Sequence, residues 1–368
     1  MDLTVERSAL RAELARLRRV LQARPARPIL SAVLLEGVVG SDRLQMRASG
    51  GDLSLHTTCP VTTRQGGQVA VDAHTLQSLV ERLPSEPIMM RSLAQWAEVE
   101  SAGVSARLPA WPADDYPASP IVTGATVDLP ARTLRGGLRR TRFVVRGDTP
   151  VHQQAVQLTV GGGSLVLTAT DGRRLARVVA PLGDASSRLV ELLPRRLVVE
   201  LDGFLDAAGD ASVSCTVGDR HVSFRHGDRM LVSGRLETRF PACDGLFDAE
   251  RPYRVRCERR LLREAVERAA VVSDDEHRRL DLAIAPHSIT VSAGSPARGQ
   301  VSAAVPATCQ GPSLDVGVDI HYLLDYLAVE TAERVTMAFS DEARLVCWSG
   351  EGEDIDEYRY VVASMCHV

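Results

Sequence analysis

The sequence contains no lysine and no asparagine, so arginine supplies all 43 basic residues. Both missing residues use AA-rich codons, and an extremely GC-rich genome is the simplest explanation. Avoidance of lysine modification is the alternative, and nothing in the sequence favours it. Aromatic residues are also scarce, at 4%, so the cores must be built mainly from leucine, valine and alanine.

Long hydrophobic runs and paired cysteines are missing as well. No segment approaches the roughly 18–20 apolar residues that a membrane-spanning helix needs, and charges occupy the N-terminal positions where a signal peptide is apolar. The seven cysteines are scattered without a CxxC pair, which argues against a zinc site and a disulfide scaffold. We therefore expect a cytoplasmic protein with no membrane contact, no metal and no cofactor.

A repeated pattern is present three times. Amphipathic segments at 6–22, 131–146 and 258–272 each contain a Leu-Arg pair, and these pairs lie 124 and 128 residues apart. A second helical pattern follows each one by 61 to 66 residues, at 72–83, 193–205 and 319–329. Such consistent spacing predicts three copies of one unit with two helices each.

Short alternating segments surround these helices. They lie at 97–108, 155–160, 164–170, 212–217, 220–224, 288–293 and 334–339, and glycine-rich or polar turns separate them. This pattern predicts antiparallel sheet, with roughly eight strands in each copy. Proline-rich segments at 109–120 and 240–252 mark the junctions. The expected fold is α+β, with three tandem domains at 1–122, 123–250 and 251–368, each with two helices packed on antiparallel sheet.

Positive charge is concentrated in the first helix of each copy. These three segments carry formal charges of +3, +6 and +1, which leaves −14 for the rest of a chain whose total is −4. In the middle segment, arginines recur at steps of three and four residues, and no acid is present. A charge run is usually a solvated face, but such faces normally mix signs. A uniform stripe suits the phosphate backbone of DNA without reading its sequence.

Signatures of catalysis are lacking. The sequence has no P-loop, GxGxxG, GxSxG or HExxH motif. Asp171, beside two arginines, is better explained as a turn residue with a local ion pair than as a catalytic carboxylate. Cys366 and His367 are adjacent, so their side chains would point apart on a strand and could not share a metal. We expect no enzymatic activity; an α+β hydrolase is the weaker alternative, and it would need a deep polar pocket.

Several motifs together resemble the bacterial DNA polymerase III β-subunit, or sliding clamp, family. The segment at 169–176, ATDGRRLA, is similar to the TDG-x-R-L-A motif of these clamps, and 239–241, RFP, is similar to a second clamp element. RPARPIL at 24–30, WPADDYP at 111–117 and YRYVV at 358–362 are similar to three others. The matches are in the same order over essentially the whole chain.

This resemblance implies a homodimer, joined head to tail into a ring around duplex DNA. It also implies a clamp loader and a cleft that binds peptides of DNA polymerase and other partners. By position, the cleft residues are Thr170, Gly172, Arg173, Arg174, Leu175, Pro241, Leu246, Tyr322, Val361, Val362 and Met365. DNA contact is expected from Arg24, Arg135, Arg139, Arg142 and Arg146. The dimer interface is expected at Leu108, Val271 and Val272.

The sequence also departs from the family pattern. Ala106 replaces a bulky residue that often helps to close the ring, and the C-terminal residues lack the usual proline and arginine. These departures leave a second role open, in which a clamp-like decoy binds partner peptides without encircling DNA. The basic first helices favour the ring, because a decoy does not need them.

Overall fold

The computed structural model describes residues 1–22, 24–183, 188–340, 344–351 and 357–365. The chain folds into two compact units, each formed by two stretches of sequence. The first unit comprises Met1–Arg132 and Val199–Arg235, and the second comprises Thr133–Val198 and Leu236–Val368. Each unit contains one twelve-stranded antiparallel sheet.

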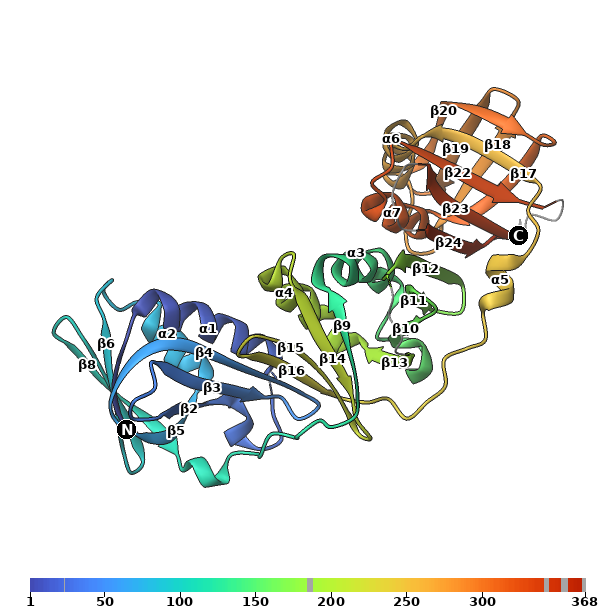
Figure 1. Ribbon diagram of the computed structural model, residues 1–368. Coiled ribbons are helices and arrows are strands. Elements are labelled where there is room, and N and C mark those ends of the chain that lie inside the picture. Colours follow the sequence, from blue (N-terminus) through green and yellow to red (C-terminus); the bar gives the residue numbers. More distant parts are fainter. Residues whose placement is uncertain (23, 184–187, 341–343, 352–356, 366–368) are drawn as a thin grey trace. The chain divides into compact units, whose positions relative to one another are not determined.

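The first third of the chain lies entirely in the first unit. Its elements are β1 (Asp2–Val5), α1 (Arg7–Val20), β2 (Ala32–Gly37), β3 (Arg43–Ser49), β4 (Leu53–Gln65), β5 (Gly67–Asp72), α2 (Ala73–Val80), β6 (Ile88–Leu93), β7 (Trp96–Ser101) and β8 (Val104–Trp111). The strands follow the order β1-β6-β7-β8-β5-β2-β3-β4, and β4 also pairs with β1. Helix α1 packs on β4 and β3 and lies beside α2 (Figure 1).

The middle third is shared between the two units. Its elements are β9 (Ala125–Pro130), α3 (Ala131–Thr141), β10 (Ala155–Gly161), β11 (Ser164–Thr170), β12 (Arg174–Pro181), β13 (Leu189–Pro194), α4 (Arg195–Ala208), β14 (Ser212–Val217), β15 (His221–His226) and β16 (Arg229–Gly234). Strands β9 and β14–β16 extend the first sheet, whereas β10–β13 belong to the second. The compact units therefore do not follow the predicted domain boundaries, which stay a prediction.

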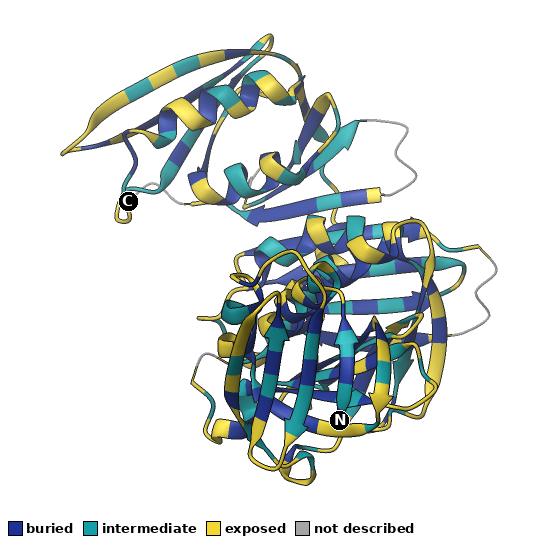
Figure 2. Cartoon of the chain, turned by 90° about the vertical axis from the view of Figure 1, so that its left-hand side faces the viewer, coloured by how far each residue is buried: buried dark blue, intermediate teal, exposed yellow. Residues whose placement is uncertain are grey.

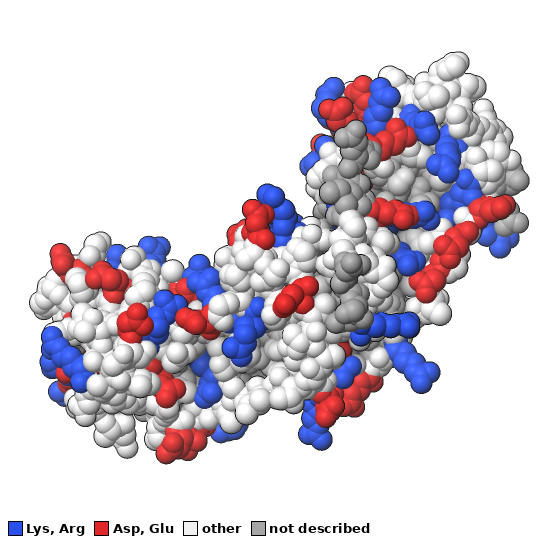
Figure 3. All heavy atoms as spheres, viewed as in Figure 1, with Lys and Arg blue, Asp and Glu red and all other residues white. Residues whose placement is uncertain are grey.

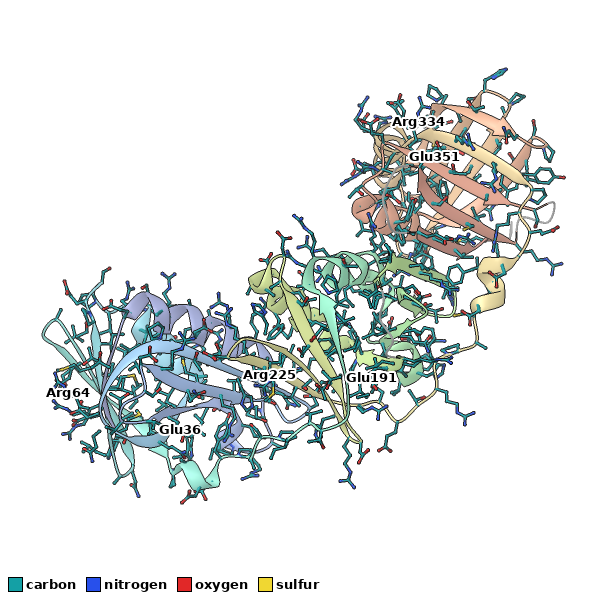
Figure 4. All side chains as sticks on the ribbon, viewed as in Figure 1. Glu36, Arg64, Glu191, Arg225, Arg334 and Glu351 are labelled. Atoms are coloured by element: carbon teal, nitrogen blue, oxygen red, sulfur yellow. The ribbon has the colours of Figure 1, made fainter. Side chains whose placement is uncertain are left out.

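The last third completes the second sheet. Its elements are α5 (Asp244–Asp248), β17 (Tyr253–Glu258), α6 (Arg259–Ala270), β18 (Arg279–Ala285), β19 (Ser288–Ser295), β20 (Gly299–Gln310), β21 (Leu314–Asp319), α7 (Ile320–Val329), β22 (Arg334–Phe339), β23 (Leu345–Glu351) and β24 (Glu357–Ala363). In β22 and β23, Arg334 lies opposite Glu351 in the register, and both are labelled in Figure 4. Glu351 also forms an ion pair with Arg256 of β17 at 2.9 Å.

The described chain thus has three successive sets of eight strands, and one pairing rule joins them. Strand β4, the fourth of the first set, pairs with β16, the eighth of the second. Strand β12, the fourth of the second set, pairs with β24, the eighth of the third. Both junctions are antiparallel.

Burial follows the sequence pattern that predicted these elements. Buried and exposed residues alternate along the strands, as Figure 2 shows, because successive strand side chains point to opposite faces. Leu10, Leu14 and Leu17 form the buried stripe of α1, and none of them is exposed to solvent. Asp72 and Asp319 cap α2 and α7 by accepting hydrogen bonds from backbone N–H groups of the first turn.

Two predicted elements differ from the structure. The middle helix ends at Thr141, and not at Arg146 as predicted. Thr141 leaves the helical conformation, and its hydroxyl donates to the carbonyl oxygen of Gly137, which helps to end the helix. The strand predicted at 97–108 is a hairpin of β7 and β8, because Ala102 and Gly103 adopt positive φ angles of 46° and 82° and reverse the chain.

Candidate functional site

The ATDGRRLA motif forms the tight turn between β11 and β12. Asp171 accepts hydrogen bonds at Oδ1 from the backbone N–H groups of Arg173 and Arg174, each at 3.0 Å. The Thr170 hydroxyl donates to the Arg174 carbonyl oxygen and accepts from the Gly172 N–H. Gly172 has φ +85°, a conformation in which other residues are strained. The motif therefore fixes the backbone of the turn.

Arg174 is the buried charge at the centre of this turn. Its guanidinium donates to Asp171 at 2.9 Å, to Asp325 of α7 at 2.6 Å and to the carbonyl oxygen of Phe143 at 3.0 Å. It also stacks on the Tyr322 ring, 4.2 Å from the centroid. A buried guanidinium needs such partners to offset its desolvation. Arg174 is therefore a structural anchor that joins β12 to α7.

Three of the other predicted cleft residues lie on β12 and β24, and they do not share one face of the sheet. Leu175 pairs with Val361, and both belong to one apolar cluster, with Cys243, Phe247 and Cys347. Val362 pairs instead with Arg174 and Val346, so its side chain points to the opposite face. We call the cluster of Leu175 and Val361 the apolar floor of the predicted cleft. Val361 belongs to this floor, and Val362 does not.

Much of that floor is already covered by this chain. Leu175 and Val361 are only 3% and 2% exposed, and Phe240 also packs against their cluster. Leu246 of α5 is 42% exposed, and Pro241 is half-buried. They adjoin Phe240 and Phe247 in the chain, and we call these two accessible residues the apolar rim.

Met365 lies beyond the end of β24. Its backbone N–H donates to the Gly317 carbonyl oxygen of β21, its own carbonyl oxygen accepts from Arg279, and 37% of the residue is exposed. The adjacent Cys366 and His367 lie outside the described residues.

A hollow of about 310 Å³ lies on the Tyr322 side of the turn. Its lining consists of Arg146, Asp148, Thr149, Pro150, Asp171, Arg173, Arg278 and Tyr322. Arg146 binds Asp148 through two hydrogen bonds of 3.0 and 3.1 Å. That pairing lowers the pKa of Asp148 and raises the pKa of Arg146. Burial, and then the nearby Asp171 carboxylate, raise the pKa of the Tyr322 hydroxyl.

The arginines predicted to bind DNA do not form one continuous helical stripe. Arg135 and Arg139 lie on α3, Arg142 begins a single 3₁₀ turn, and Arg146 follows that turn. Leu134 and Leu138 of α3 are fully buried. Arg24 is exposed between α1 and β2. On the face drawn in Figure 3, basic and acidic side chains are interspersed.

The predicted interface residues occupy different environments. Leu108 of β8 is 8% exposed, Val271 after α6 is 71% exposed, and Val272 is 7% exposed. Val271 and Val272 follow the helix and do not belong to a strand. The open strand edge nearest to them in the chain is β20.

Sequence reasoning missed four residues that organise this region: Phe143, Phe247, Asp325 and Tyr360. Asp325 follows Tyr322 by three residues on α7, a spacing that places both on one helix face, so it could have been found. Tyr360 stacks on Tyr326 at 5.4 Å and donates to the Tyr322 carbonyl oxygen. Burial raises the pKa of Tyr360 above its usual value, although Arg174 opposes the shift.

Neither a metal centre nor a membrane helix was found in the described parts of the chain. Among these residues, no three His, Cys, Asp or Glu side chains gather in an arrangement that could hold a metal ion. No helix among them is long and apolar enough to cross a membrane.

The fold and the turn define a clamp-type protein with three repeated α+β sets. Family models match the chain as the N-terminal domain (residues 1–120), central domain (128–242) and C-terminal domain (246–364) of the DNA polymerase III beta subunit. The chain therefore belongs to the DNA polymerase III β-subunit, or sliding clamp, family.

Individual relatives agree over the full length. The beta sliding clamp of Pseudomonas putida is 28% identical over 366 residues, which cover 97% of this chain and 98% of the relative. A solved sliding clamp of Pseudomonas aeruginosa, bound to griselimycin, is 26% identical, with a TM-score of 0.93 and full coverage of both chains. A beta sliding clamp of C. crescentus, with PEG bound to its putative beta-motif tethering region, is 25% identical, with a TM-score of 0.92 and the same coverage.

Proposed function

We propose that two copies of this chain form a head-to-tail ring around duplex DNA and tether DNA polymerase and other partners to it, without catalysing a reaction. The observation that carries this proposal is the strand-pairing rule. The fourth strand of one set pairs with the eighth strand of the next. Two strands have no such partner within the chain as described: β20, the fourth strand of the third set, and β8, the eighth strand of the first set.

Both of these strands have an open edge among the described residues. Residues 104–109 of β8 pair with β7 on one side, and only Ala110 and Trp111 pair with β5 on the other. Residues 299–306 of β20 pair with β19, and only residues 307–310 pair with β17. Pairing β8 of one copy with β20 of the next would repeat the internal junctions. Two copies would then close with six such junctions and no open edge of this kind.

DNA contact follows from the basic first helices. Within its bounds α3 carries four arginines and no acid, and such a surface gains sequence-independent affinity by releasing counterions. Helix α6 also carries four arginines, but two glutamates lie within its bounds and pair with Arg260 and Arg263. We therefore assign α3 the leading role in DNA contact.

Sedimentation tests the ring. The wild type should sediment at twice the 39.8 kDa chain mass. Ala106→Asp and Ala303→Asp each place a carboxylate on one open edge and should give monomer. Ala125→Asp on β9, an exposed position outside the rule, is the matched control and should leave the dimer intact. Dimers should also remain on nicked circular duplex after loading by the clamp loader, and leave it once the circle is cut.

Ala106 favours a second candidate function. This small residue offers little contact area on the β8 edge, so the dimer should be weaker than one with a bulky residue there. A wild-type monomer at tens of micromolar would favour the decoy, which binds partner peptides without encircling DNA.

Peptide binding is assigned to the apolar rim above Leu175 and Val361. A peptide with one aliphatic and one aromatic anchor can contact Leu246 and Pro241, at about 1.5–3 kcal/mol for each buried anchor. Leu246→Asp should weaken binding of a polymerase-derived peptide by at least about 2 kcal/mol in calorimetry, because the carboxylate would lose water without gaining a partner. Equal binding by wild type and variant would place the peptide elsewhere.

A further inference from the structure

We infer that the hollow beside Tyr322 binds a carboxylate of a partner peptide, either an acidic side chain or the free chain end. This inference rests on the proposed peptide-binding function and specifies what one part of that site recognises. Every residue that lines the hollow belongs to the second compact unit.

The carboxylates already present in the hollow are engaged. The Asp171 side chain is 3% exposed, and it accepts backbone hydrogen bonds at Oδ1 and the Arg174 bond at Oδ2. Asp148 receives both hydrogen bonds of Arg146. Asp319, which forms an ion pair with Arg278, caps the first turn of α7.

Three groups that line the hollow have hydrogen-bond donors without an acceptor among the described residues. The Arg173 guanidinium is exposed and has no partner there, and the Tyr322 hydroxyl has none either. Arg278 gives only Nη2 to Asp319, at 3.2 Å, and its Nε is buried without a hydrogen bond. A hollow with spare donors and occupied acceptors is complementary to an acceptor group.

The net formal charge of the region does not select one kind of acceptor. Arg146, Arg173, Arg174 and Arg278 balance Asp148, Asp171, Asp319 and Asp325, so the region has no formal excess of either sign. A carboxylate therefore gains affinity from the individual donors that it meets and not from net charge. These donors are on Arg173, Arg278 and Tyr322. Hydrogen bonds between ionised partners are roughly twice as strong as neutral ones, so a carboxylate should bind better than an amide.

Calorimetry with synthetic peptides tests this inference. The probe is a short peptide with one leucine and one phenylalanine, acetylated and amidated, in which glutamate or glutamine is placed at each remaining position in turn. A third version carries glutamine and a free C-terminal carboxylate. At one position, or at the free end, the carboxylate version should bind about fivefold more tightly than its amide counterpart. The position that shows the effect identifies the source of the carboxylate.

Variants connect that preference to the hollow. Arg173→Gln combined with Arg278→Gln should remove the fivefold preference, so that the acid and amide peptides bind the variant equally. Arg220→Gln, at the exposed turn before β15 in the other unit, changes the net charge in the same direction and should leave the preference intact. Equal binding of acid and amide peptides by the wild type would overturn the inference and leave the peptide site standing. Failure of every peptide to bind would overturn both.

Discussion

Arg174 and Asp171 form a buried ion pair with an Nε–Oδ2 distance of 2.9 Å, and their side chains are 2% and 3% exposed. Removing one partner of a buried pair leaves the other desolvated and costs about 3–5 kcal/mol. Arg174→Met should lower the free energy of unfolding by about that amount in urea titration. Arg173→Met, at the exposed neighbouring position, should change it by less than about 0.5 kcal/mol. Equal losses would mean that the turn, and not the pair, is stabilising.

His56 should make the stability of the first unit depend on pH. Burial, and then the charges of Arg47 and Arg225, lower its pKa to about 4, and its Nε2 lies 2.6 Å from the Ser119 hydroxyl. Because the unfolded imidazole titrates near 6.5, its contribution to stability is fully present above that pH and is lost as the pH falls towards 4.

The size of the His56 effect follows from the shift. Each pKa unit corresponds to about 1.4 kcal/mol, so the loss should approach about 3 kcal/mol. Urea titrations at pH 7.5, 5.5 and 4.5 measure it. Because other groups also titrate in this range, His56→Gln is the control, and its stability should fall less over the same interval. Parallel curves for the two proteins would contradict the assignment.

The two glycines of α3 should respond in opposite ways to alanine. A Cβ at Gly136 meets nothing within 4 Å, whereas a Cβ at Gly137 would lie 2.5 Å from Cδ1 of the fully buried Leu167. Gly136→Ala should raise the free energy of unfolding by about 0.5–1 kcal/mol, through helix propensity alone. Gly137→Ala should lower it, because overpacking outweighs that gain. Denaturant titration of both variants provides the comparison, and a gain at both sites would show that α3 can move away from the sheet.

Most of the fold could be predicted from the periodicity of the sequence. The three helix pairs were predictable because buried stripes such as that of Leu10, Leu14 and Leu17 repeat at helical spacing, and because Asp72 and Asp319 provide caps at corresponding places. The end of α3 was not predictable from periodicity, because the arginine spacing continues past Thr141 although the helix does not. The β7–β8 turn was missed because Ala102 is an unusual residue at positive φ.

The turn at 169–176 could be predicted from the sequence, but the strand face that each cleft residue occupies could not. The ATDGRRLA segment marks the turn, but which strand face each cleft residue occupies depends on the β12–β24 register. That pairing joins residues 178 to 188 positions apart. A shift of one residue exchanges the two faces, and this is why the sequence placed both Val361 and Val362 in the cleft, although only Val361 shares a face with Leu175. The bond from Arg174 to Asp325 is likewise an interaction between distant segments.

The last prediction distinguishes three arginines that we expect to contact DNA from Arg146, which lines the hollow. Arg135, Arg139 and Arg142 lie on α3 or directly after it, whereas Arg146 lines the hollow and binds Asp148. Replacing the first three with glutamine should weaken retention on circular duplex and reduce the slope of log K against log salt by about 0.9 for each phosphate that is no longer neutralised. Arg146→Gln removes one equal charge and should leave that slope unchanged. If Arg146→Gln lowers the slope as much as a single α3 variant does, the basic surface continues beyond α3 after all.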